Sequence, residues 1–476
     1  MLFATHHVLF ERLARADDAQ PLQKNDYAIE FYQGPLIAPI RVTGLAGAYT
    51  AYAEGVEGTA SNAAAPAVRE PFSHKWFDYD LSASFSFPGT FSGTDFDNRG
   101  RRNISGTSSF GDFLYLNLGI QLQFGALGLA ITDDLQQFTL TPSTERDPGL
   151  TLQTSRWHVL AAYGLLGNQL AIGLGARVVA LQISQSGQFV PGRTLFNMVG
   201  ASPEAGALYK PDGAPWRLGA TLRAPVIAHS LGESAATDAN GVQRAGTFIL
   251  PEKIVQPWEA EVGVALQAGP RPLNPRWLNP HEEEAPIHAA VDAARARRER
   301  EHIAKLAAAP ANRRADVQRA IVEQERDLRM IEDMRVAAES ERLLAQRRAR
   351  YANWPREKIL MVASFLFTGA SANTIDVASF LDQKLEPFGR SVTVMPRFGI
   401  EAEPVHDRVR ARIGSYLEPS RFPNGNARQH LTCGADIKLA PFDAWGLIGA
   451  TTWRISFAVD LAPRYANWGV GIGAWH

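Results

Sequence analysis

The stretch from Met395 to Ser415 alternates charged and apolar side chains along two consecutive limbs. Apolar residues such as Ile400 and Ile413 fall between the charged ones. Because successive side chains of a strand point to opposite faces, this period of two predicts two strands, each with one charged and one apolar face. The charged residues are Arg397, Glu401 and Glu403 in the first limb, and Arg408, Arg410 and Arg412 in the second.

The two limbs are joined by the short segment 403–406, Glu-Pro-Val-His, which predicts a hairpin. In a soluble sandwich the charged face of such a hairpin meets water, whereas in a membrane barrel the charges line the lumen and the apolar face meets lipid. Glu401 and Glu403 could pair with arginines across the hairpin, and each such pair contributes about 0.2 to 1 kcal/mol. In a lumen the arginines could instead attract a carboxylate or set a preference for anions.

Composition limits the choices without deciding between them. The 476 residues carry a formal net charge of −1, so bulk electrostatics do not indicate a nucleic-acid partner. No run of 18 apolar residues exists, and the longest, Ile359 to Phe367, is too short for a membrane-spanning helix. Cys433 is the only cysteine, which excludes an intramolecular disulfide and argues against a thiolate metal site, and we interpret it as a small buried or lipid-facing residue.

Alternation recurs along the chain and gives fourteen candidate strands. Long polar connections largely alternate with tight turns, as they do between the extracellular and periplasmic sides of outer-membrane barrels. Closure matters because in lipid only a closed sheet leaves no unpaired edge. The predicted strands are 78–87, 113–124, 127–139, 156–163, 170–184, 216–224, 226–231, 258–266, 358–368, the two limbs of 395–415, 430–439, 453–461 and 468–472, and segment 186–215 is predicted as a loop.

A glycine-rich segment precedes the first predicted strand and contains a recognisable motif. The run from Gly44 to Ala51, GLAGAYTA, is followed by Ser61-Asn62-Ala63-Ala64. This pattern resembles the N-terminal hatch signature of the FadL-type family, outer-membrane transporters of long-chain fatty acids, although Ala63 stands where that family usually has proline. The hatch residues singled out by the resemblance are Gly44, Gly47, Tyr49, Thr50, Asn62 and Pro66.

The resemblance implies a fold and a function. The fold is a barrel of fourteen strands with an N-terminal hatch, set in outer-membrane lipid. The function is uptake of a hydrophobic compound such as a long-chain fatty acid, which would bind in the lumen and leave sideways through the wall or past the hatch. The ligand-binding residues carry no readable motif.

Residues 281–350 differ from the rest of the chain. They contain no glycine and mix acids and bases with alanine and leucine, which is typical of helices. Pro310 divides the segment into predicted helices at 286–308 and 314–351. The segment replaces the short turn between the eighth and ninth predicted strands, so parity places it in the periplasm. It is either a self-paired, solvated helical hairpin or a docking arm for a periplasmic or cell-envelope component.

The N-terminus resembles a degraded export signal. Ala14-Arg15-Ala16 has the small-x-small pattern of a signal cleavage site, but the preceding residues include His6, His7 and Glu11 where an apolar region belongs. We interpret residues 1–16 as a signal-like segment with a misassigned start, which favours export. A cytoplasmic protein is the alternative.

Motifs for catalysis, cofactors and metals are missing from the sequence. It contains no G-x-S-x-G, Walker, H-E-x-x-H or C-x-x-C pattern, so we predict no enzyme and no cofactor. His281, His288 and the acids 282–284 could contact a metal, but their position at a helix start favours plain solvation. No metal site is therefore predicted.

Together these patterns predict an all-β fold, a transmembrane antiparallel barrel of about fourteen strands with a hatch and a helical hairpin insert. The alternative functions are uptake of a hydrophobic compound and a non-transporting structural or shuttle barrel of a secretion or surface machine that docks through its insert. A soluble all-β protein is a third interpretation. The predicted divisions are the signal-like segment 1–16, hatch 17–76, strands one to eight 77–268, insert 269–356 and strands nine to fourteen 357–476.

Overall fold

The computed structural model describes most of the chain. The predicted signal-like segment 1–16 lies outside the described residues, as do parts of the long connections between predicted strands. The described residues are 20–31, 34–69, 73–89, 94–100, 109–141, 149–185, 193–229, 235–423, 425–443 and 450–475.

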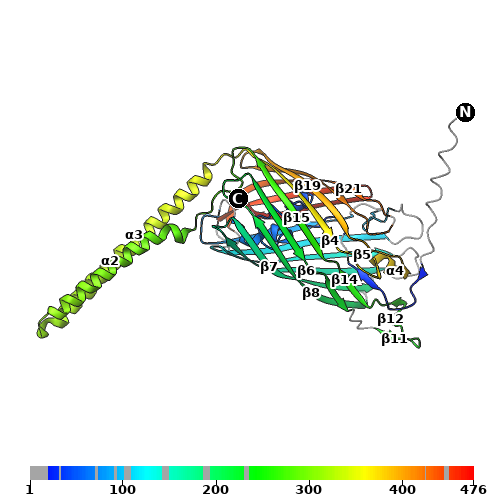
Figure 1. Ribbon diagram of the computed structural model, residues 1–476, viewed down its shortest axis with the longest axis horizontal. Helices are drawn as coiled ribbons and strands as arrows, with labels where there is room; N and C mark the ends of the chain where they lie inside the picture. The colour runs from blue at the N-terminus through cyan, green and yellow to red at the C-terminus, as the bar shows by residue number, and fades with distance from the viewer. Residues whose placement is uncertain are drawn as a thin grey trace.

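Fourteen strands within the described residues form one closed antiparallel barrel, in which β23 pairs with β3 (Figure 1). The prediction of an all-β barrel with about fourteen strands is confirmed. The strands are β3 Phe77–Ser86, β4 Ser109–Phe124, β5 Leu127–Thr141, β6 Leu150–Leu165, β7 Leu170–Gln185, β8 Thr194–Tyr209, β9 Trp216–Arg223, β15 Glu259–Ala268, β16 Ile359–Thr368, β19 Thr393–Val405, β20 Val409–Glu418, β21 Arg428–Asp443, β22 Ala450–Ala462 and β23 Tyr465–Ala474.

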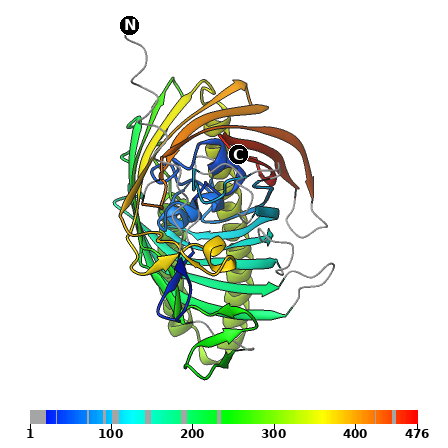
Figure 2. The same ribbon diagram turned by 90° about the vertical axis from the view of Figure 1, so that its right-hand side faces the viewer.

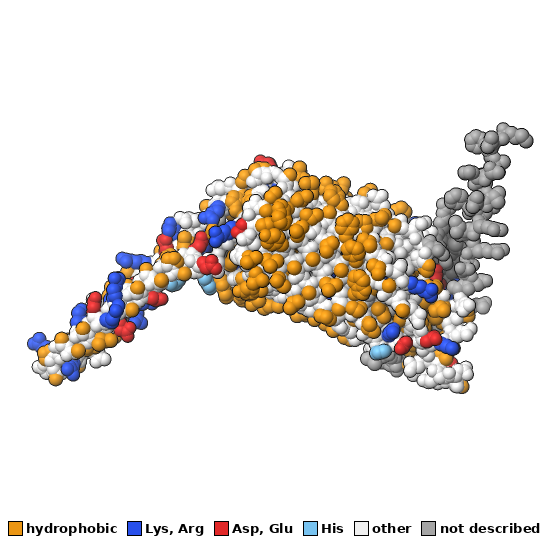
Figure 3. Space-filling view, viewed as in Figure 1, with side chains coloured by type: hydrophobic (Ala, Val, Ile, Leu, Met, Phe, Trp, Pro, Cys, Tyr) orange, Lys and Arg blue, Asp and Glu red, His pale blue; other side chains and the backbone are white. Residues whose placement is uncertain are grey.

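The outer surface of the barrel is apolar, and its interior carries the charges. Phe398 and Ile413 point outward and are 46% and 59% exposed, whereas Glu401 and Arg412 point inward and are 0% and 4% exposed. Hydrophobic side chains cover the visible wall of the barrel, and the visible charged side chains lie mostly beyond the two ends of this wall (Figure 3). A closed barrel with an apolar exterior and a polar interior is the architecture of an outer-membrane protein.

Among the described residues, no helix combines the length and apolar character needed to cross a membrane.

The strand count is right, but two individual predictions are wrong. Segment 186–215 was predicted as a loop, yet it contains the sixteen-residue barrel strand β8. Segment 226–231 was predicted as a barrel strand, yet its strand β10, Val226–His229, pairs with β14, Lys253–Gln256, in a small separate sheet. The two errors cancel, which leaves the number and the parity of the strands unchanged.

The hatch, described from residue 20 onward, runs through the interior of the barrel (Figure 2). Its strand β2 pairs with strands from the connections that follow β9 and β16, at the end of the barrel we call the loop end. At its other end Arg69 donates a hydrogen bond to Gly125 O in the β4–β5 turn. The hatch therefore makes contacts at both ends of the barrel. Its elements are β1 Gln20–Pro21, β2 Ala28–Glu30, α1 Ile40–Gly44, η2 Val56–Ala60 and η3 Ala65–Ala67.

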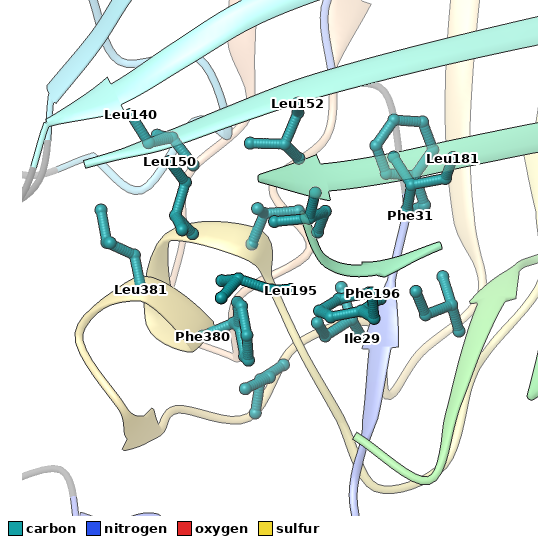
Figure 4. Close-up of a cluster of buried hydrophobic side chains, with 14 of the residues drawn as sticks. Ile29, Phe31, Leu140, Leu150, Leu152, Leu181, Leu195, Phe196, Phe380 and Leu381 are labelled. Carbon is teal, nitrogen blue, oxygen red and sulfur yellow. The ribbon is translucent and has the colours of Figure 1, made fainter. Parts of the chain in front are cut away.

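Short elements cover the loop end and pack around an apolar cluster. Phe380 of α4 packs edge-on against Phe196 of β8 at 5.6 Å between ring centroids, and Ile29 of the hatch belongs to the same cluster (Figure 4). The covering elements, besides β10 and β14, are β11 Ala236–Thr237, β12 Gln243–Ala245, β13 Phe248–Ile249, β17 Thr374–Ile375, α4 Val377–Leu381 and β18 Lys384–Leu385.

The predicted helical hairpin projects from the opposite end, which we call the arm end (Figure 1). The arm consists of α2, Pro280–Ala308, the short η4, Ala311–Arg313, and α3, Arg314–Ala352. The helix α2 starts six residues before the predicted position 286, because the Asn279 side chain caps it by accepting the His281 N–H and Pro280 occupies the first turn. Arg298 pairs with Glu325 and Glu332, which ties α2 to α3.

Candidate functional site in the barrel lumen

The predicted charge ladder is built largely as a set of buried ion pairs. Glu401 and Arg412 are direct neighbours across β19 and β20, with 2.7 Å between Glu401 Oε2 and Arg412 Nε. Arg412 also binds Asp436 of β21, and Arg410 lies 3.9 Å from Glu403. The ladder is therefore neutralised within the wall rather than left to attract an anion.

Of the two remaining members of the predicted ladder, Arg408 departs from this pattern and Arg397 keeps it with a partner on another strand. Arg408 lies in the turn 406–408 and is exposed, so its assignment to the lumen face is wrong. The strand β20 begins one residue later, at Val409. Arg397 is half-buried, pairs with Glu261 of β15 at 3.4 Å, and lies beside the hatch glycine Gly47.

Charged residues of the hatch complete the network, although no motif in the sequence marks them. Arg41 lies 3.7 Å from Glu401, and Glu54 binds Arg217 of β9 at 2.8 Å. Glu57 pairs with Arg454 of β22. In the sequence, these three residues could have been recognised as isolated charges in a segment otherwise made mostly of small apolar residues. These pairs cross from hatch to wall, so they hold the hatch in place.

The hatch motif residues make specific contacts with their own segment and with the wall. The Asn62 amide donates to Thr50 O at 2.9 Å and to Ala207 O of β8 at 3.1 Å, and its oxygen accepts the Ala64 N–H. Tyr49 donates its hydroxyl to Glu54 O. The three other motif residues also lie against the wall: Gly44 O accepts from Thr432, Pro66 O accepts from Gln123, and Gly47, at φ +76°, lies beside Arg397.

Glycines on the inner face of the wall make room for the hatch. A Cβ atom at Gly206 would overlap with the Asn62 side chain, and one at Gly219 would overlap with the Thr50 carbonyl. A Cβ atom at Gly128 would likewise overlap with the Pro66 carbonyl. The hatch backbone thus approaches the wall more closely than any side chain would allow. The lumen is plugged tightly along this path.

A cavity of about 130 Å³ remains between the hatch and the wall. Hatch residues 34–38 form one side of it. The opposite side carries the paired charges Arg177–Glu259, at 3.1 Å, and Arg397–Glu261. The apolar lining comes from Phe31, Leu36, Ile37, Val42, Leu366 and Met395.

The cavity adjoins the apolar cluster of the loop end. Phe31 and Ile37 belong to that cluster and also line the cavity. The guanidinium carbon of Arg156 lies 5.4 Å from the centre of the Phe31 ring, so Phe31 stands where the apolar cluster meets the charged lumen. A hydrophobic compound entering at the loop end would therefore meet apolar side chains first and this amphipathic cavity next.

A second, larger hollow of about 460 Å³ lies at the wall itself, across β3, β4 and β5. Its lining includes the outward-facing Leu118, Ile131 and Trp157, which are 38% to 49% exposed. Here β3 pairs with β23 over only five residue pairs, from Ser82 to Ser86. The hollow is thus an apolar groove on the lipid-facing side, beside the shortest seam of the barrel.

The arm and the residues that lead into it contact the segment through which the hatch leaves the barrel. We call this segment, Arg69 and residues 73–76, the hatch exit. The Trp277 indole donates to Ser73 O at 3.2 Å, and the Arg69 guanidinium lies 4.9 Å from the Trp277 ring. His281 stacks on Trp76 with 4.8 Å between ring centroids. The start of the arm and the end of the hatch therefore form one packed unit.

The described part of the chain contains no group of three or more His, Cys, Asp and Glu side chains arranged to hold a metal ion. Among the residues considered from the sequence, His281 is occupied in the stack on Trp76, and Glu283 and Glu284 face Arg347. Cys433 is exposed on the outer face of β21.

The fold and the lumen define a plugged fourteen-stranded membrane β-barrel, and solved structures of this architecture are similar to it. A FadL homologue from Pseudomonas aeruginosa matches with a TM-score of 0.48 and 10% identity, covering 93% of this chain and 99% of its own. The Ralstonia pickettii toluene transporter TbuX matches at 0.46 with 11% identity, covering 93% and 98%. The Pseudomonas putida toluene transporter TodX matches at 0.46 with 9% identity, covering 95% and 99%.

Sequence comparison adds no relative. No model of a known protein family matches the chain, and no curated protein matches it either.

Proposed function

We propose that the protein is an outer-membrane uptake barrel for a small hydrophobic compound. The observation that carries the proposal is the continuity between the apolar cluster at the loop end and the lumen cavity, which share Phe31 and Ile37. A compound leaving water gains free energy by entering this cluster, at about 25 cal/mol for each Å² of apolar surface buried. The cavity below it offers the next place to bind.

The size of the cavity favours a molecule of one ring over a long-chain fatty acid. A cavity of about 150 Å³ in another protein accommodates benzene, and the lumen cavity measures about 130 Å³. A fatty acid of sixteen carbons would fit only if the hatch moved. The fatty acid named as an example from the sequence is therefore the less favoured ligand within the same class.

The charges around the cavity favour a neutral ligand. Arg177 faces Glu259, Arg397 faces Glu261, and Arg223 lies 3.4 Å from Glu204. Each of these three guanidinium groups already has a carboxylate, so an ionised ligand that bound one of them would have to displace that carboxylate. Breaking a buried pair costs about 3 to 5 kcal/mol. A neutral ring meets no such cost.

Two exits are compatible with this proposal. A compound could leave sideways toward the apolar groove at β3 to β5, where the seam with β23 is short. It could also pass the hatch, but that route would require separating the hatch-to-wall ion pairs of Arg41, Glu54 and Glu57. We favour the sideways exit because it leaves these pairs intact.

The experiment is to fill the cavity with one side chain and measure binding of toluene to the purified protein. Met395 lines the cavity, whereas its neighbour Val394 is 42% exposed on the lipid-facing side. We expect Met395→Trp to abolish saturable toluene binding and Val394→Trp to leave it unchanged. Equal binding by both variants would remove the cavity from the route. Hexadecanoate binding with no toluene binding would reverse the ligand preference.

A second candidate function rests on the arm. The helix α3 is 39 residues long, and its side chains Met330 and Met334 are each 57% exposed. A non-transporting scaffold that docks an envelope protein through the arm would use such a surface. Affinity purification of the full chain tests this role. A periplasmic protein that co-purifies, and is lost on deleting residues 281–350, would favour the scaffold over the transporter.

The placement of the arm in the periplasm is part of the same proposal and follows from strand parity. The arm joins β15 to β16 at the end of the barrel where the tight turns lie. Protease added to intact cells should therefore spare Arg297 and Arg314. Cleavage at either residue would place the arm outside the cell.

A further inference from the structure

A small cleft opens at the root of the arm, beside the hatch exit. It measures about 40 Å³ and is the meeting point of three segments, the hatch exit, the approach to α2 and the last turns of α3. Its lining combines guanidinium groups with aromatic rings. The residues that matter for its chemistry are Arg69, His74, Arg276, Trp277, Arg350 and Tyr351.

Positive charge at this cleft exceeds the negative charge placed to balance it. Arg69 is 3% exposed and donates to neutral acceptors, namely Gly125 O, Ser73 Oγ and Trp76 O, at 2.6 to 2.8 Å. Asp78 is the acid whose charge acts on Arg69. Arg276 and Arg350 are exposed, and neither has a carboxylate within 4.0 Å among the residues the structure describes.

Two acids near the cleft, Glu283 and Glu284, do not balance this excess positive charge because both already pair with Arg347. Its Nη1 atom lies 2.6 Å from Glu283, and its Nη2 atom lies 3.7 Å from Glu284. Both acids therefore form ion pairs with Arg347. Its buried Nε atom makes no hydrogen bond to any residue in the described part of the chain.

The titration of His74 reports the same local field. Burial lowers the pKa of His74 most strongly, and the nearby charges of Arg348 and Arg347 lower it further, to about 4. The effect of Asp78 runs in the opposite direction and is smaller. The part of this lowering that comes from Arg348 and Arg347 reflects the positive charge beside the cleft.

The position of the cleft matches the surface of a membrane. It lies between the end of β15 at Ala268 and the start of β16 at Ile359, directly beyond the membrane-spanning strands. Trp277 and Trp354 line it, and Trp76 lies beside His281 at its edge. Tryptophan and tyrosine gather at the level of lipid headgroups, and arginine binds phosphate oxygens through several donors at once.

We propose that the cleft at the arm root binds the phosphodiester headgroup of an anionic phospholipid, with Arg276 and Arg350 as the residues that contact the phosphate. The acyl chains lie along the apolar outer wall, and Trp277 and Trp354 pack at the headgroup level. Such a lipid ties the arm to the membrane surface. This role goes beyond uptake and does not depend on which compound the lumen carries.

The test titrates the full chain, purified in mild detergent, with short-chain phosphatidylglycerol, short-chain phosphatidylcholine and inorganic phosphate, and follows tryptophan fluorescence. We expect saturable binding of phosphatidylglycerol, weaker binding of phosphatidylcholine because its choline cation is repelled, and no saturation by phosphate alone. Each basic residue near an anionic lipid surface contributes about a five-fold factor in binding. The double variant Arg276→Gln, Arg350→Gln should therefore bind phosphatidylglycerol about 30-fold more weakly.

A matched control separates the site from the general charge of the arm. Arg335 is exposed on α3, away from the cleft, and has no ion pair among the described residues. Arg335→Gln removes one charge from the same helix and should leave phosphatidylglycerol binding unchanged. Unchanged binding in the double variant, or equal loss in the control, would overturn the proposal. Saturation by inorganic phosphate at the affinity of the lipid would show a free-phosphate site and overturn the lipid assignment.

Discussion

Glu401 and Arg412 face each other across β19 and β20, and the Arg412 Nε donates a hydrogen bond to a Glu401 carboxylate oxygen over 2.7 Å. Both side chains are fully buried. Arg412 also binds Asp436, and Glu401 also binds Lys358 at 3.0 Å. With Arg41 of the hatch 3.7 Å away, this pair joins three strands of the wall, and Lys358 just before β16, to the hatch.

Removing Arg412 should therefore destabilise the whole barrel. Arg412→Ala leaves the carboxylates of Glu401 and Asp436 buried with fewer partners, and loss of one member of a buried pair costs about 3 to 5 kcal/mol. Unfolding by urea in detergent micelles measures the change. The control is Arg408→Ala in the exposed turn of the same hairpin, which should stay within about 0.5 kcal/mol of the unmodified protein. Equal effects would mean that the ladder contributes no special stability.

The tight fit between hatch and wall should depend on single glycines. Gly206→Ala places a methyl group against the Asn62 side chain, so we expect the hatch to shift and ion conductance through the barrel to rise in planar bilayers. Gly111→Ala is the control, because a Cβ atom there meets only the Thr139 hydroxyl, at 3.2 Å. Conductance that stays at the unmodified level in Gly206→Ala would show that the hatch tolerates displacement.

How far the sequence predicts the fold depends on what faces lipid at each strand. The hairpin of β19 and β20 is evident because Phe398 and Ile413 alternate with charges. The strand β8 was missed because its outward residues are mostly small, including Ala201 and Pro203, so no apolar alternation appears. Segment 226–231 alternates like a barrel strand, but β10 pairs inside the loop-end sheet, which depends on contacts far apart in the sequence.

The candidate site was predictable only in part, for a related reason. The inward charges of the wall follow from alternation, whereas their partners Arg41, Glu54 and Glu57 come from a hatch segment without a regular period. The cavity is formed by hatch residues 34–38 packed against four or more strands, and no local pattern encodes that assembly. A motif can indicate that a hatch exists, but the space it leaves is a property of the folded chain.

The contact between the arm and the hatch exit should help to keep the hatch closed. Trp277→Ala removes the hydrogen bond to Ser73 O and the contact with Arg69, so we expect a looser hatch exit and a higher ion conductance. Met334→Ala, on the exposed face of α3, is the control and should change nothing. The same conductance in both variants would mean that the arm root does not restrain the hatch.

The barrel should fold without the arm. The strands β15 and β16 pair directly over ten residue pairs, from Glu259 with Thr368 to Ala268 with Ile359, so their pairing does not require the inserted helices. Replacing residues 281–350 with a short glycine-serine linker should leave a barrel that still migrates as a folded species in unheated electrophoresis. Loss of the folded species would show that the arm contributes to assembly of the barrel.

Stability at the arm root should fall in mild acid because of His74. Burial and the charges of Arg348 and Arg347 lower the pKa of His74 from 6.5 to about 4 in the folded protein. Between these values the unfolded chain binds the proton more tightly, so the free energy of unfolding decreases as pH falls from 6.5 toward 4 and is unaffected by this group above 6.5. We expect the protection of amides in residues 275–281 against hydrogen exchange to drop at pH 5 relative to pH 7.5. His74→Gln, which cannot titrate, should remove that difference, and a difference that persists in the variant would assign it to another group.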